Sequence, residues 1–293
     1  ARFVAASASC AVIPLAIAWV GDVVPYERRQ AMLSQFISGQ ILGMVFGQVA
    51  GGILGDLIGW RMVFVVLACV YVGAGLALFA EMRREPRTRL ATSPGASLNP
   101  LAIVARYAAL LRLPWVRTVL LAVGIEGMLF FGAFAYVGNE LHHRFGLSFT
   151  MVGLAMTAYG AGGLLYTLSA RRLLRALGER GLAIGGGLAM AAGLGGLLAA
   201  PDPVWAVLAI LVAGLGFYML HNTLQTNGTQ MTPEARGSGL ALFAACLFIG
   251  QSIGVGLAAL VVDRWGIAPV LALSVLLLPL VGLAFARALR RRP

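Results

Sequence analysis

Long apolar stretches recur along the whole chain, separated by shorter segments that carry most of the charges and turn residues. A helix of about 20 apolar residues crosses the hydrocarbon core of a bilayer, so each stretch predicts a transmembrane helix. The alternation of polar and apolar residues that is typical of a membrane β-barrel does not occur in the sequence. The pattern predicts an all-α polytopic membrane protein with nine transmembrane helices, over residues 2–21, 32–56, 61–80, 118–138, 149–169, 182–200, 204–225, 238–262 and 266–286.

The composition supports this prediction. Hydrophobic residues make up 60% of the 293 residues, charged residues only 11%, and the mean hydropathy is +0.88. A soluble domain of this length could not bury so much apolar surface. The three cysteines lie inside predicted helices without ligand spacing, so we expect no disulfide, no metal site and no cofactor.

The net charge of +11 comes from arginine, because the sequence contains no lysine. When successive connections are assigned alternately to the two sides of the membrane, the arginines gather on one side. The other side holds only Arg61, Arg144 and Arg264. The positive-inside rule therefore places the connection 81–117 and the C-terminus in the cytoplasm, with the protein in the inner membrane. The basic surface should face anionic lipid head groups rather than nucleic acid.

Glycines repeat at every fourth position in one predicted helix, at Gly39, Gly43, Gly47, Gly51 and Gly55. Small residues at this spacing let two membrane helices approach closely. The stripe also drifts by about 40° per step around the helix, so it can follow a crossing partner. The spacing fits either a tightly packed contact or a contact along which helices slide.

The sequence also contains a weak internal repeat. Asp22, Pro25 and Arg28 lie in the connection after the first predicted helix, and Pro233 and Arg236 repeat the proline and arginine at the same spacing. Six predicted helices separate the copies, so both face the same side of the membrane. This is typical of transporters built from two parallel six-helix halves. In that register residues 2–21 form the fourth helix of the first half, and we expect three more helices upstream.

These residues carry a resemblance to the major facilitator superfamily, and within it to the drug- and sugar-efflux permeases. Asp22-x-x-Pro25-x-x-Arg28 resembles the family's loop between helices four and five. The stretch from Gly43 to Leu54 is similar to its helix-five antiporter motif, although Gln48 replaces the proline. Arg2 occupies the place of the arginine in the helix-four motif. Residues 171–180 resemble a degenerate second copy of the family's Gly-Arg-rich loop, in which Gly178 and Arg180 fit and Arg175 replaces an acid.

The resemblance implies a monomeric secondary transporter rather than an enzyme, working by alternating access of two halves. It favours export of small organic molecules, drugs or sugars, driven by inward proton flow. We assign residues 1–80 to the N-terminal half, 81–117 to a cytoplasmic linker with an interfacial helix from Pro100 to Leu113, and 118–293 to the C-terminal half. Proton-coupled uptake remains an alternative, because Gln48 departs from the antiporter motif. An inactive, non-transporting remnant is a second alternative.

Polar groups within predicted membrane helices are costly, so each is a candidate site. Glu126 is the one acidic residue deep in a predicted span. A carboxyl group buried there can take up and release a proton near neutral pH, and it can otherwise be a structural partner of a neighbouring helix. Arg2 and His221 are the other candidates for proton coupling.

The predicted helix 204–225 is the most polar, and its polar run continues to Gln230. At helical spacing, Tyr218, His221, Asn222, Gln225 and Thr229 share one face. Such a face is suited to lining a substrate cavity, or to bonding a neighbouring helix. Gln40, Gln48 and Gln251 are further cavity candidates. His142 and His143 are expected in a solvated outer loop rather than at a metal site.

Overall fold

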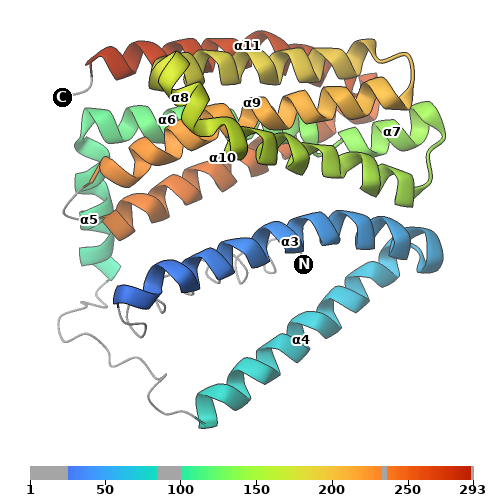
Figure 1. Cartoon of the computed structure of the whole chain (residues 1–293), viewed down its shortest axis with the longest axis horizontal. Coiled ribbons are helices and arrows are strands. Elements are labelled where there is room, and N and C mark those ends of the chain that lie inside the picture. The colour runs from blue at the N-terminus through green and yellow to red at the C-terminus, as the bar shows by residue number, and fades with distance from the viewer. Residues whose placement is uncertain (1–25, 85–99, 233–235, 292–293) are drawn as a thin grey trace. The chain divides into compact units, whose positions relative to one another are not determined.

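A computed structural model describes residues 26–84, 100–232 and 236–291, and all secondary structure in these ranges is helical. The all-α prediction is confirmed. The helices, shown in Figure 1, are α3 (Tyr26–Ile58), α4 (Trp60–Arg84), α5 (Pro100–Arg112), α6 (Pro114–Phe134), α7 (Val137–Phe145), α8 (Phe149–Ala199), α9 (Pro203–Gln230), α10 (Arg236–Trp265), α11 (Ala268–Ala288) and the 3-10 turn η3 (Leu289–Arg291).

Six helical segments in the described ranges are long and apolar enough to cross a membrane, so the chain is a multi-pass membrane protein. They are Trp60–Glu81, Pro114–Phe145, Phe149–Ala199, Pro203–Gln230, Ser238–Trp265 and Ala268–Ala288. The predicted span 2–21 lies outside the described residues, and the predicted span 32–56 falls within α3.

Contacts divide the chain into two units, residues 1–47 with 54–99, and residues 48–53 with 100–293. In the first unit, α3 and α4 are separated by Gly59, whose φ of 78° suits glycine. In the second unit, α8 packs on α9 and α11, and α6 packs on α10, α11 and α9. The buried core of this second unit surrounds Phe130, Met190, Ile210, Leu220 and Leu278.

Helix α8 contains two of the predicted spans. Its 51 residues would measure about 77 Å as one straight helix, more than twice the thickness of a hydrocarbon core. Gly178 interrupts it with non-helical backbone angles, φ 65° and ψ 177°. Both parts then pack on α9, since Gly162 lies against Gly214 and Gly186 lies against Gly216. The two predicted spans, 149–169 and 182–200, therefore lie on either side of Gly178.

The segment expected to be a solvated outer loop is the helix α7, and that expectation is wrong. Val137 and Leu141 lie one turn apart and are both buried, which fixes one face of this helix. Gly146, with φ 65°, ends it. Nδ1 of His142 lies 2.6 Å from the carbonyl oxygen of Leu147, and the ring stacks on Phe149. His142 thus has a structural role.

The closest glycine contacts among the described residues lie elsewhere than in the predicted stripe. Within the described part of the chain, no neighbouring atom lies within 4 Å of a Cβ built on Gly39, Gly43, Gly47 or Gly51. Between α6 and α10, in contrast, a Cβ on Gly250 would overlap the backbone of Gly124. The role of the glycine stripe stays a prediction.

Arg144 of α7 binds the C-terminal end of α8. Its guanidinium donates hydrogen bonds to the carbonyl oxygens of Leu197 (3.0 Å), Leu198 (3.4 Å) and Ala200 (2.7 Å). The last carbonyls of a helix lack partners in the helix itself and carry partial negative charge. Arg144 therefore satisfies these groups and links α7 to α8.

We expect Arg144→Gln to lower the free energy of unfolding by about 1–3 kcal/mol, because hydrogen bonds from a charged donor are lost at a helix end. Denaturant titration of the purified protein in micelles measures this change. Arg175→Gln removes the same charge from an exposed position in α8 and serves as the control. Equal stability of the two variants would contradict the capping role.

Candidate functional site

Glu126 and His221, which were predicted separately, form a hydrogen-bonded pair between two helices. Glu126 lies on α6 and is fully buried, whereas the side chain of His221 on α9 is 14% exposed. Nδ1 of His221 lies 2.8 Å from Oε2 of Glu126. Either a neutral or a protonated imidazole can donate from Nδ1. The pair therefore joins the one buried carboxyl group of the described spans to an imidazole on a neighbouring helix.

Local packing explains why Glu126 is buried. The next residue, Gly127, lets the backbone of α10 pass closely, with the carbonyl oxygen of Leu247 only 2.6 Å from where a Cβ would be. Phe217 stacks on the imidazole of His221 at 4.8 Å, and Phe243 lies 5.6 Å from the same ring. These neighbours exclude water, and a charge interaction is stronger in such surroundings than in water.

The second carboxyl oxygen, Oε1 of Glu126, is buried without a hydrogen-bond partner among the described residues. Burying a charged carboxylate oxygen without a hydrogen bond costs free energy, and adding a proton converts this oxygen to a neutral hydroxyl group. The pair can thus exist with one proton, shared across the contact with His221, or with a second proton on the carboxyl group. This arrangement can bind and release a proton chemically, and each change alters the attraction between α6 and α9.

One more interhelical contact continues the polar face of α9. The ring of Tyr218 lies 5.7 Å from the ring of Tyr159 on α8. Asn222 and Gln225 are exposed, and the Thr229 hydroxyl donates to its own helix at the Thr226 carbonyl. The face predicted from spacing therefore packs on α8 at Tyr218 and is open farther along.

Among the described residues, one further candidate lies next to this pair. Gln251 of α10 is half-buried, and its backbone nitrogen lies 3.4 Å from the Cβ position of Gly127. Gln48 is exposed on α3. Arg2, Asp22, Pro25 and Pro233 lie outside the described residues, and for Gln40, Arg28 and Arg236 only the helical backbone is described.

Sequence reasoning missed a second buried polar contact, between Asn227 and Glu179. Asn227 of α9 is fully buried, and its Nδ2 donates to the Thr223 carbonyl (2.9 Å) and to Oε2 of Glu179 (3.3 Å). Glu179 directly follows the break at Gly178. Asn227 lies within the polar run that ends at Gln230, but it does not lie on the face that joins Tyr218 to Thr229. Helical spacing therefore did not single it out. This contact links the turn inside α8 to α9.

Comparison with known proteins identifies the family of the chain. Residues 1–255 and 140–293 match the family model described as Major Facilitator Superfamily. An uncharacterized MFS-type transporter of Bacillus subtilis (strain 168), YceJ, is 28% identical over 203 residues, which cover 68% of this chain and 49% of that protein. A chloramphenicol resistance protein of Streptomyces lividans is 24% identical over 253 residues, covering 86% of this chain and 63% of the relative. The chain thus spans about half the length of the first relative and less than two thirds of the second.

Proposed function

Because the chain belongs to the major facilitator superfamily, we propose that the protein is a secondary transporter that exports small organic molecules in exchange for protons. Membership of this family implies a transporter rather than an enzyme. The observation that carries the proton-coupled part of the proposal is the buried pair of Glu126 and His221, with one carboxyl oxygen left unbonded.

In this proposal the pair is the proton-binding group. With Glu126 ionised, its attraction to His221 holds α6 and α9 together at this depth of the membrane. A proton that enters from outside binds the carboxyl group and weakens the attraction, which favours the conformation open to the cytoplasm. Release of that proton to the cytoplasm, when substrate binds, restores the pair. The two halves, which we assign to residues 1–80 and 118–293, alternate access in this cycle, and Arg2 is a second candidate for coupling.

Export, rather than uptake, is favoured by the likeness to a chloramphenicol resistance protein. Chloramphenicol is therefore the first compound to test, as a small neutral organic molecule. Uptake driven by protons stays the second candidate, because Gln48 replaces the proline of the antiporter motif. We place the protein in the inner membrane with its C-terminus in the cytoplasm, from the distribution of arginines.

The test uses the full-length protein reconstituted in vesicles with an imposed pH gradient. We expect chloramphenicol to move against its own gradient, from the compartment of higher pH to the more acidic one, because protons flow the other way. Movement in the same direction as the protons would establish uptake instead. Transport in neither direction, by a protein that stays folded and is tested with several organic compounds, would favour the non-transporting alternative.

A further inference from the structure

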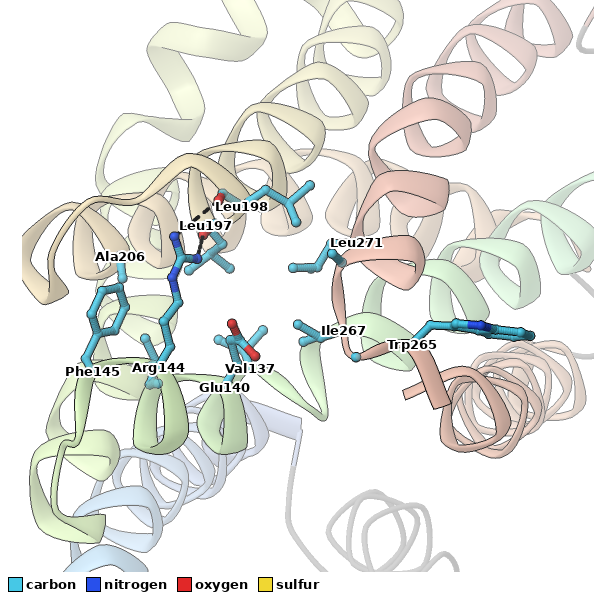
Figure 2. A pocket seen from close by; sticks show the side chains of 13 residues that line it. Val137, Glu140, Arg144, Phe145, Leu197, Leu198, Ala206, Trp265, Ile267 and Leu271 are labelled. Carbon is cyan, nitrogen blue, oxygen red and sulfur yellow. Dashed lines mark hydrogen bonds between the residues drawn. The ribbon is translucent and has the colours of Figure 1, made fainter. Parts of the chain in front are cut away.

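A cavity of about 230 Å³ lies in the second unit, at the end of its helices that carries α7. The cavity is formed by α7, the C-terminal end of α8, the start of α9 and the turn between α10 and α11 (Figure 2). Its walls are mostly apolar and include the buried side chains of Val137, Leu141, Leu197, Ile267 and Leu271. It is separate from the pair of Glu126 and His221, because neither residue lines it.

One carboxylate points into this apolar cavity. Figure 2 shows the Glu140 side chain directed between the α8 end and Ile267. Among the described residues, no hydrogen bond and no ion pair engages this carboxylate. A charged group against apolar walls is stabilised by a counter-ion that donates hydrogen bonds to it.

The expected partner of Glu140 is engaged elsewhere. Arg144 follows it by four residues on α7, the spacing at which acidic and basic side chains commonly pair on a helix. The guanidinium instead donates to three carbonyl oxygens at the end of α8. These carbonyls carry the negative end of the helix dipole and offset the arginine charge. Arg144, which also lines the cavity, therefore has hydrogen-bond partners, whereas the half-buried carboxylate of Glu140 has none among the described residues.

From this geometry we propose that the cavity binds a compact organic monocation, an alkyl- or arylammonium group. Its N–H groups would donate to Glu140, and its apolar part would contact Leu141, Ile267 and Leu271. The volume lies below the roughly 300–1,000 Å³ of sites for drug-sized ligands, so a small ligand fits. A bare metal ion does not suit the site, because it needs several oxygen ligands and the nearby carbonyls are bonded to Arg144.

The ammonium group can belong to a free amine or to the ethanolamine head group of a lipid. The experiment therefore uses the full-length protein in nanodiscs of phosphatidylcholine and phosphatidylglycerol, with benzylammonium as the probe and calorimetry as the measurement. We expect saturable binding, at least about tenfold tighter than that of neutral benzyl alcohol, since an ionic hydrogen bond is lost in the alcohol. If phosphatidylethanolamine added to the nanodiscs displaces the probe, the lipid is the natural occupant, and if it does not, a free amine is.

Three variants test the residues. Glu140→Gln removes the charge and should weaken binding of benzylammonium at least about tenfold. Ala268→Phe keeps the charge and fills the cavity from an exposed rim position. It should therefore weaken the binding of both benzylammonium and benzyl alcohol. Asp263→Asn makes the same charge change at an exposed position near this end of α10, outside the cavity, and should bind like the unaltered protein.

Unchanged binding in Glu140→Gln, or equal affinity for the amine and the alcohol, would overturn the proposal. Thermal unfolding of each variant identifies any that is misfolded. If Glu140→Gln is misfolded, the effect of Ala268→Phe on binding decides the test. The proposal does not depend on proton-coupled export, because the cavity shares no residue with the pair of Glu126 and His221.

Discussion

Glu126→Gln in the full-length protein should abolish proton-driven transport, with a loss of about 100-fold or more, the scale of effect for a side chain that transfers a proton. Glutamine keeps the size of the side chain and can still accept the hydrogen bond from Nδ1 of His221, but it cannot bind or release a proton. Exchange of labelled for unlabelled substrate, without a pH gradient, should therefore persist. The measurement is transport into vesicles with and without an imposed gradient.

The control for this prediction is Glu81→Gln, which removes a carboxylate from an exposed position in α4. It should leave both driven transport and exchange intact. If Glu126→Gln still transports against a gradient, Glu126 is a structural partner of α9 and the coupling role fails. If Glu126→Gln also loses exchange, His221→Gln separates two explanations. Damage to the interface between α6 and α9 would abolish exchange in both variants, whereas a loss of proton coupling alone would leave exchange intact.

Gly254→Ala should destabilise the second unit by about 1–3 kcal/mol or more, the usual cost of overpacking. A single added methyl group would overlap the backbone of α6 at Met128, which cannot move without displacing the helix. The same contact involves Gly132, whose Cβ would lie 2.9 Å from the carbonyl carbon of Gly254. Close backbone approach of this kind is what small residues permit in membrane helices.

Gly256→Ala on the same helix is the matched control. No described atom lies within 4 Å of its Cβ position, so the methyl group meets no obstacle and alanine favours the helix by up to about 1 kcal/mol. Unfolding both variants in micelles with increasing denaturant compares them directly. A Gly254→Ala protein as stable as Gly256→Ala would show that α6 and α10 do not approach as closely as described.

Much of the fold was predictable because span length and charge are local properties of the sequence. The break between the two spans of α8 was located near Gly178, where arginines and glycine interrupt the apolar pattern. The helix α7 was missed because its charged residues suggested a loop, while only contacts in the folded protein bury Val137 and Leu141. Glycine spacing identified one stripe, but the identity of a packing partner is not local. The glycine contact of α6 and α10 joins segments more than a hundred residues apart.

The same limit applies to the candidate site. The cost of polar groups in a membrane singled out Glu126 and His221 individually. Their contact depends on how α6 packs on α9, which the sequence does not state. The carboxylate of Glu140 was overlooked for a related reason, since it lay in a segment assigned to solvent. Glu140 can be recognised as a candidate binding residue only when the cavity and the contacts of Arg144 are known.

The break at Gly178 also constrains how the chain enters the membrane during synthesis. The spans on its two sides are joined without a long loop, and the joint carries Arg171, Arg172, Arg175 and Arg180. Each arginine would cost about 2.5–3.5 kcal/mol at the centre of the bilayer, so we expect the joint to stay on the side where it is made. The two spans are therefore expected to leave the translocon together, as a helical hairpin, before α9 emerges from the ribosome to pack against both.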